Sequence, residues 1–141
     1  EARTHRAFLD EPVPEETLRA IYDLCRWGPT SGNSSPMRVT FVVTPEGKQR
    51  LEPCLDSYNR AQTMAAPVTA IIAYDLEFYE QLPRLYLEED ARSWFAGRPE
   101  KIAHDCHSCP LFRNCGQYAI VLDLQRAQAL AGIGAAAYHR G

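Results

Sequence analysis

The segment PVTAIIAY, residues 67–74, is an uninterrupted apolar run, and it most limits the folds open to this chain. Strands covered on both faces form such continuous runs, whereas half-exposed strands alternate between apolar and polar residues. We therefore expect a central strand over residues 67–74. A second strand is expected at MRVTFVV, residues 37–43, which is rich in β-branched residues. Because two strands do not form a self-sufficient sheet, their partners must come from residues beyond this sequence or from a second subunit.

Helical patterns surround the two strands. The segment 14–27, PEETLRAIYDLCRW, carries a proline in its first turn and two glutamates at the positive end of the helix dipole. Its apolar residues recur at helical spacing and are expected to form one buried face: Leu18, Ile21, Tyr22 and Cys25. The dipeptide Gly28-Pro29 is expected to end this helix.

Three further helices are expected. One starts at Thr44-Pro45 and carries Cys54 on its apolar face, one covers residues 76–97 with a break at Pro83, and one covers residues 117–131. The five aromatic residues of the 76–97 segment are expected to pack against other residues. This order of helices and strands contains no internal repeat and no linker, so it predicts a single α+β domain over residues 1–141.

Charge and hydropathy exclude several functional classes. The chain has 15 basic and 18 acidic residues and a net charge of −3, which offers no general attraction to nucleic acid or to an anionic membrane. No apolar run approaches the roughly 18 residues of a membrane-spanning helix, and no charged-then-apolar leader opens the chain. We therefore expect a cytoplasmic protein. Its start at Glu1 and its end at Gly141, inside a small-residue run, predict a piece of a longer protein.

The loop between the first helix and the first strand is unusually long. It spans residues 28–36, GPTSGNSSP, whereas a plain connection needs about two to six residues. One interpretation is a long surface loop. The other is a ligand cradle, because small residues let backbone groups approach a flat or anionic ligand closely. The preceding motif RTHRAF favours the cradle, since Arg3 and Arg6 with Thr4 between them suit a phosphate group.

Together these motifs resemble a known family. The segment RTHRAFLDEPVPEETLRAIYDLCRWGPTSGNSSPMRVTFVV resembles the N-terminal half of the flavin-dependent nitroreductase superfamily. The segment APVTAIIAYDLEFYEQLPRLYLEEDARSWF is similar to its malonic-semialdehyde (3-hydroxypropionate-forming) reductase branch. The resemblance runs over residues 3–103. It implies a mixed sheet flanked by helices, an FMN cofactor, NAD(P)H as co-substrate, a homodimer and a small acceptor such as malonic semialdehyde or a nitro compound.

The resemblance also implies roles for individual residues, although no protein acid or base is assigned. Those implied to bind the FMN phosphate are Arg3, Thr4 and Arg6, and those implied to line the isoalloxazine from the neighbouring subunit are Thr30, Ser31, Gly32 and Asn33. Those implied to lie near the polar edge of the flavin are Asn59 and Gln62, where Gln62 departs from the lysine common in the family. Those implied to pair with a substrate carboxylate are Arg84, Arg92 and Arg98, and the alternative for these three is a solvated helix surface.

The sequence after residue 103 supports two alternatives to an oxidoreductase. The stretch 104–117, HDCHSCPLFRNCGQ, departs from the family, and the 104–141 segment lacks its later glycine-rich segment, last strands and basic phosphate contacts. We therefore expect a fold incomplete at its C-terminus. The 104–117 stretch contains three cysteines and two histidines, which are the residues that usually bind zinc. One alternative is therefore a zinc-binding module built on Cys106, Cys109 and Cys115 with His104 and His107. The third interpretation is a non-catalytic truncated module with uncovered apolar faces at Ile71 and Ile72.

Overall fold

The computed structural model describes residues 7–108, 120–123 and 135–138. Its α-helices are α1 (Glu15–Cys25), α2 (Pro45–Leu51), α3 (Ser57–Ala65), α4 (Leu82–Leu85) and α5 (Pro99–Ser108). Its 3-10 helices are η1 (Ser31–Asn33), η2 (Glu52–Cys54), η3 (Phe78–Gln81) and η4 (Ala91–Trp94). Its strands are β1 (Met37–Val42), β2 (Thr69–Tyr74), β3 (Ile120–Asp123) and β4 (Ala135–Tyr138). The predicted α+β class is confirmed.

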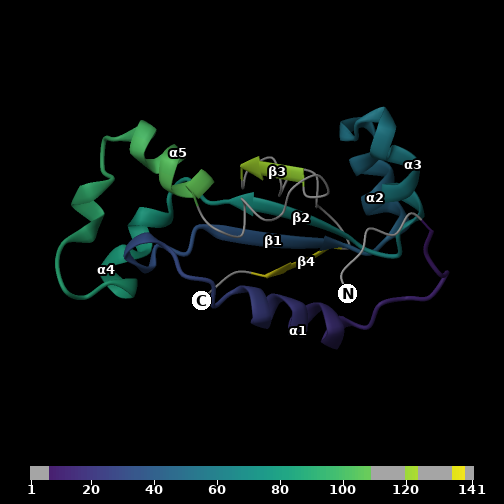
Figure 1. The fold of residues 1–141 in the computed structure, drawn as a ribbon, viewed down its shortest axis with the longest axis horizontal. Helices are drawn as coiled ribbons and strands as arrows, with labels where there is room; N and C mark the ends of the chain where they lie inside the picture. Colours follow the sequence, from purple (N-terminus) through teal and green to yellow (C-terminus); the bar gives the residue numbers. More distant parts are fainter. Residues whose placement is uncertain (1–6, 109–119, 124–134, 139–141) are drawn as a thin grey trace.

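The four strands form one mixed sheet in the order β3-β2-β1-β4 (Figure 1). Strand β1 pairs antiparallel with β2 from Met37↔Tyr74 to Val42↔Thr69, and it also pairs antiparallel with β4. Strand β2 pairs parallel with β3, so β2 lies inside the sheet, as its apolar run predicts. The expectation that partner strands come from outside this sequence is wrong, because β3 and β4 belong to the same chain.

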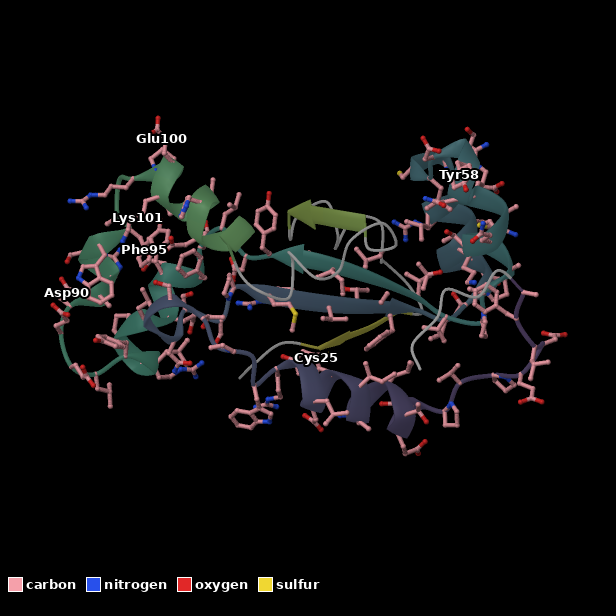
Figure 2. All side chains as sticks on the ribbon, viewed as in Figure 1. Cys25, Tyr58, Asp90, Phe95, Glu100 and Lys101 are labelled. Carbon is pink, nitrogen blue, oxygen red and sulfur yellow. The ribbon has the colours of Figure 1, made fainter. Side chains whose placement is uncertain are left out.

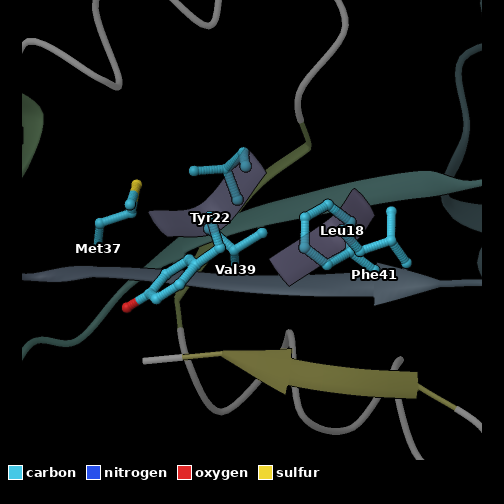
Figure 3. Packing of buried hydrophobic residues seen from close by; sticks show 6 residues of the cluster. Leu18, Tyr22, Met37, Val39 and Phe41 are labelled. Carbon is cyan, nitrogen blue, oxygen red and sulfur yellow. The ribbon is translucent and has the colours of Figure 1, made fainter. Parts of the chain in front are cut away.

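Helix α1 covers one face of the sheet. Leu18 and Tyr22 pack against side chains of β1 that point to this face, namely Met37, Val39 and Phe41 (Figure 3). Cys25 is half-buried beside this cluster. The predicted burial of Ile21 is wrong: it is 44% exposed, because α1 packs on the sheet through Leu18 and Tyr22 and Ile21 lies to one side of them.

A second cluster covers the opposite face of the sheet. It contains Val42, Ile71 and Ala73 from the strands together with Leu51 and Leu55 from the α2 region. Alternate residues of each strand thus enter different clusters, as the two-residue period of a strand requires. The prediction of a central strand covered on both faces is confirmed.

The helix predicted after β1 needs one correction. Helix α2 ends at Leu51 and a 3-10 turn, η2, follows, which changes the period of the buried positions. Leu51 and Leu55 are buried, whereas Cys54 is exposed, so its predicted burial is wrong. Helix α3, capped by the Asp56 side chain that accepts from the Tyr58 N–H at 2.8 Å, was not predicted.

The segment between β2 and α5 forms a third cluster instead of the predicted broken helix. Its short helices are η3, α4 and η4, and Pro83 lies in the first turn of α4, where a missing N–H is tolerated. The predicted packing of its aromatic residues is confirmed. The ring centroids of Phe78 and Phe95 are 4.9 Å apart, and Tyr79, Tyr86 and Trp94 pack around them. Figure 2 shows Phe95 of this cluster beyond one end of the sheet, and Tyr58 of α3 beyond the other end.

The helix predicted over residues 117–131 is wrong at residues 120–123, which form β3. The β-branched residues Ile120 and Val121 suit a strand, and the free edge of β2 supplies the hydrogen-bonding partners. The other residues of this prediction lie outside the described ranges. Within the described ranges, the helices are too short or too polar for any of them to cross a bilayer.

Candidate functional site

The 28–36 loop leaves α1 and enters β1 at the end of the sheet where β2 ends (Figure 1). Three of its residues have a left-handed backbone: Gly32 (φ +53°), Asn33 (φ +53°) and Ser35 (φ +43°). Asparagine tolerates this region, but for a serine it is uncommon and unfavourable. Such a conformation persists only where the surrounding contacts impose it, and strained backbone of this kind clusters at functional sites.

The loop's own side chains impose part of this conformation. The Ser35 backbone N–H donates to the Thr30 hydroxyl oxygen at 3.1 Å, and the Ser35 hydroxyl donates to the Asn33 carbonyl at 3.3 Å. Two backbone bonds close the η1 turn, from Asn33 N–H to the Thr30 carbonyl and from Ser34 N–H to the Ser31 carbonyl. The hydroxyls of Thr30 and Ser35 therefore stabilise the loop itself.

The loop also contacts the short helices that follow β2. The Asn33 side-chain amide donates to the Leu85 carbonyl at the end of α4 at 3.0 Å. A Cβ atom added to Gly32 would lie 3.2 Å from Cζ3 of Trp94 in η4. Because the glycine has no Cβ, the indole packs directly on the loop backbone. The loop is thus in direct contact with both α4 and η4.

Arg38, which the sequence analysis did not single out, connects this loop to β2. Its Nη1 donates to the carbonyls of Ser35 at 3.0 Å and Met37 at 2.9 Å, and its Nη2 donates to Asp75 Oδ2 at 2.7 Å. Both charged side chains are largely buried, with exposed fractions of 15% and 18%. A charged residue within a strand that is otherwise uncharged was the available sequence signal.

The predicted flavin-edge residues lie at the other end of the sheet. Asn59 and Gln62 are half-buried on α3, between the end of β1 and the start of β2. The 28–36 loop precedes β1, so the two groups are separated by the length of a six-residue strand, about 20 Å. Figure 1 shows α3 and the 28–36 loop at opposite ends of the sheet. Within one copy, the structure does not bring these predicted groups together.

The predicted phosphate-binding residues Arg3, Thr4 and Arg6 lie outside the described residues. The first described residues enter Figure 1 at the α3 end of the sheet, before the chain turns into α1.

Helix α3 is held in place by Lys48 of α2. The Lys48 ammonium is buried and donates to the carbonyls of Thr63 at 3.1 Å, Met64 at 3.4 Å and Ala66. These carbonyls belong to the C-terminal end of α3, where a cation complements the helix dipole. Burial lowers the pKa of Lys48. The lysine therefore fixes the end of the helix that carries Asn59 and Gln62.

The three arginines predicted to bind a substrate carboxylate have different surroundings. Arg92 makes a two-point pair with Glu80, with Nε–Oε2 at 2.7 Å and Nη2–Oε1 at 2.8 Å. This hydrogen-bonded pairing lowers the pKa of Glu80 and raises that of Arg92. Arg84 is exposed on α4, directly before Leu85, and Arg98 is exposed between η4 and α5.

The cysteine cluster is described only in part. Cys106 is fully buried in the aromatic cluster, and its thiol donates to the Asp75 carbonyl at 3.8 Å. The side chain of His104 is 77% exposed, beside Asp105. Among the residues that the structure describes, no three metal-ligating side chains gather. Cys109, Cys115 and the side chain of His107 lie outside them.

The apolar faces that a non-catalytic truncated module would leave uncovered are not open. Ile71 is fully buried and Ile72 is 9% exposed. The uncovered apolar faces predicted for a truncated, non-catalytic module are therefore contradicted. This result does not test zinc binding by the cysteines of residues 106–115.

One comparison with known proteins bears on this geometry. The model of the nitroreductase family matches residues 1–137. The match includes the 28–36 loop, both central strands and the aromatic cluster, and it continues past residue 103, where the quoted motifs end.

Proposed function

This chain belongs to the nitroreductase family of flavin-dependent oxidoreductases, and we propose that it binds FMN between two copies and passes reducing equivalents from NAD(P)H to a small acceptor. The observation that carries the proposal is the 28–36 loop. Its left-handed backbone at Gly32, Asn33 and Ser35 is held by several hydrogen bonds, which a plain surface loop does not need.

The residues of the loop fit the ring system of a flavin. The loop contains no charged residue, and its polar side chains are hydroxyls and one amide, with Ser31 exposed. Neutral donors and acceptors suit the polar edge of the isoalloxazine, which carries carbonyl and N–H groups in alternation. Ser31 and the side of Gly32 that Trp94 does not cover would lie against the ring. Thr30 and Asn33 would maintain the loop that presents them.

A second copy would complete the site. Asn59 and Gln62 are a strand length away from the loop in the same copy, so one chain cannot place both against one flavin. Helix α1 also exposes two large apolar residues, Ile21 and Leu24 (82% exposed), and Trp27, two residues beyond the end of the helix, is 66% exposed. A face of this kind is typical of an interaction surface. We propose that it contributes to the homodimer.

When bound, FMN supplies the carrier through which a hydride passes from NAD(P)H to the acceptor. The protein's part is to bind, orient and exclude water. The 28–36 loop would fix the ring, and the α4–η4 surface that contacts it would shape the space for the acceptor. The proposed phosphate ligands are Arg3, Thr4 and Arg6, whose guanidinium and hydroxyl groups suit a phosphate monoester.

For an acidic acceptor such as malonic semialdehyde, Arg84 is the best carboxylate ligand among the three arginines. It is exposed and adjacent to Leu85, whose carbonyl receives the Asn33 amide. Arg92 would first have to leave Glu80, to which it is bonded at two points. Arg98 lies in the connection between η4 and α5, 13 residues after Leu85.

The phosphate assignment is tested by the double variant Arg3→Ala/Arg6→Ala, with FMN affinity measured by fluorescence titration. We expect a loss of about 3 kcal/mol, or more than a hundredfold in Kd, because each hydrogen bond to a charged group contributes about 1.5–3 kcal/mol. Arg19→Ala is the control, since it removes an exposed guanidinium paired with Glu15. Equal FMN affinity in both variants would refute the assignment.

The acceptor class is tested with Arg84→Gln and two substrates, malonic semialdehyde and an uncharged nitro compound. We expect the KM for the acid to rise at least tenfold while the KM for the nitro compound stays within twofold, because only the acid needs the cation. Arg50→Gln, which removes an exposed guanidinium on α2, serves as the control. An equal rise in KM for both substrates would contradict the role of Arg84. Measuring the rate for each substrate with NADH and with NADPH identifies the hydride donor.

A further inference from the structure

We propose that Arg38 is a positioning residue, whose guanidinium holds the 28–36 loop in its left-handed conformation. The significance of this loop for flavin rests on the proposed function, but the positioning itself does not. Arg38 lies on β1, two residues beyond the end of the loop, and on the sheet face opposite α1.

The guanidinium of Arg38 bridges two parts of the chain that are far apart in sequence. On one side Nη1 contacts the Ser35 carbonyl at 3.0 Å, and on the other Nη2 contacts the Asp75 carboxylate at 2.7 Å. The planar fork of an arginine reaches both acceptors at once with its donors in fixed directions. A lysine offers a single charged centre and cannot reproduce both bonds with the same geometry.

Asp75 is itself a rigid anchor. Its backbone N–H donates to the Pro36 carbonyl at 2.9 Å, its Oδ1 accepts the Glu77 N–H at 2.9 Å, and its carbonyl accepts the buried Cys106 thiol at 3.8 Å. Asp75, directly after β2, is therefore hydrogen-bonded to the end of the 28–36 loop, to the turn that follows β2 and to α5. Because these partners constrain Asp75, the guanidinium is fixed from the sheet side and in turn constrains the carbonyl of Ser35.

Ser35 is where such a constraint is needed. Its φ of +43° is unfavourable for a serine, and its N–H bonds to Thr30 at the other end of the turn. Without a charged donor on the Ser35 carbonyl, rotation of this residue toward ordinary backbone angles would break the bond to Thr30. Ser31 and Gly32 lie between the two bonded residues, so their backbone conformation would then change as well.

The alternative is that the Arg38–Asp75 pair only stabilises the end of the sheet. Amide hydrogen exchange of a peptide covering residues 30–36 separates the two roles, and FMN affinity and the visible spectrum of the bound flavin are measured alongside. The variants are Arg38→Gln, Arg38→Lys and Leu18→Ala. The last removes core packing under α1, away from the loop contacts, and serves as the control for general destabilisation.

For Arg38→Gln we expect exchange in the 30–36 peptide to rise at least tenfold over the wild type. Under the proposed function, we also expect a tenfold weaker Kd for FMN and a shifted flavin spectrum. Arg38→Lys should fall between wild type and Arg38→Gln. Leu18→Ala should lower the melting temperature while leaving loop exchange within about twofold of wild type under native conditions.

Two results would overturn parts of this reasoning separately. If Arg38→Gln and Leu18→Ala raise loop exchange equally, the positioning role of Arg38 is refuted whatever the flavin measurements show. If loop exchange rises only in Arg38→Gln but FMN affinity and spectrum are unchanged, the positioning role is supported. The assignment of the loop to the flavin site would then be overturned.

Discussion

Replacing Gly32 with alanine tests how tightly the 28–36 loop and η4 are packed. The new methyl group has two consequences: it places an L side chain at a φ of +53°, and it brings a carbon to 3.2 Å from Cζ3 of Trp94. Gly97 provides a matched control, because its φ is +72° but an added Cβ there meets nothing within 4 Å. The two glycines thus share the conformational effect and differ in the contact.

The magnitudes follow from these two effects. An L residue in the left-handed region costs about 1–2 kcal/mol, and the alanine recovers about 0.4–1 kcal/mol by restricting the unfolded chain. Gly97→Ala should therefore destabilise the fold by about 1 kcal/mol, within a range of about 0–1.6 kcal/mol. At Gly32 the indole must also move by a few tenths of an ångström, and overpacking of this kind adds about 1 kcal/mol. We expect about 2 kcal/mol in total for Gly32→Ala.

The assay is urea denaturation at a fixed protein concentration, because assembly of subunits would otherwise alter the apparent stability. A double-mutant cycle with Trp94→Leu isolates the contact, since leucine removes the indole carbon that the new methyl would meet. In the Trp94→Leu background, Gly32→Ala should cost only what Gly97→Ala costs. The coupling free energy of the cycle should therefore be about 1 kcal/mol.

The reasoning would be refuted by a coupling free energy near zero. In that case the methyl group is accommodated without contact with Trp94, and the loop is not packed against η4 as described. A Gly97→Ala variant that is as unstable as Gly32→Ala would lead to the same conclusion.

Three further predictions concern residues away from this contact. Because Arg92 lowers the pKa of Glu80, their pair stabilises the fold above the ordinary pKa of a glutamate, and this contribution is lost as the pH falls through the lowered pKa. The melting temperature should therefore decrease less steeply between about pH 6 and pH 3 in Glu80→Gln than in wild type, and identical slopes would contradict the pairing. Phe78→Ala should cost about 3–5 kcal/mol in denaturant titrations, since this ring is fully buried, and a cost below about 1 kcal/mol would show that the cluster is not packed. Thr44→Ala should cost about 1 kcal/mol, because the Gly47 N–H loses its acceptor, whereas Thr44→Ser should retain most of the stability; equal losses would exclude the cap.

Local patterns predicted the parts of this fold that depend on neighbouring residues in the chain. The apolar run at β2 identified a strand covered on both faces, and the spacing of Leu18 and Tyr22 identified the helix that covers one of them. The motif RTHRAF and the 28–36 loop pointed to the nitroreductase superfamily, which the family match confirms. The malonic-semialdehyde branch and the roles of individual site residues remain predictions.

The tertiary structure decided what depends on contacts between distant segments. Residues 120–123 sit in a helical sequence pattern, yet they form β3, because the edge of β2 offers backbone partners that no local pattern records. Arg38 and Asp75 are 37 residues apart and meet only because β1 and β2 pair in antiparallel register. The hydrogen bond from Asn33 to Leu85 joins residues 52 positions apart, and it depends on the packing of α4 against the 28–36 loop. The periodicity of a sequence shows which face of a helix or strand is buried. The register of the strands and the path of the chain between them determine which side chains come into contact.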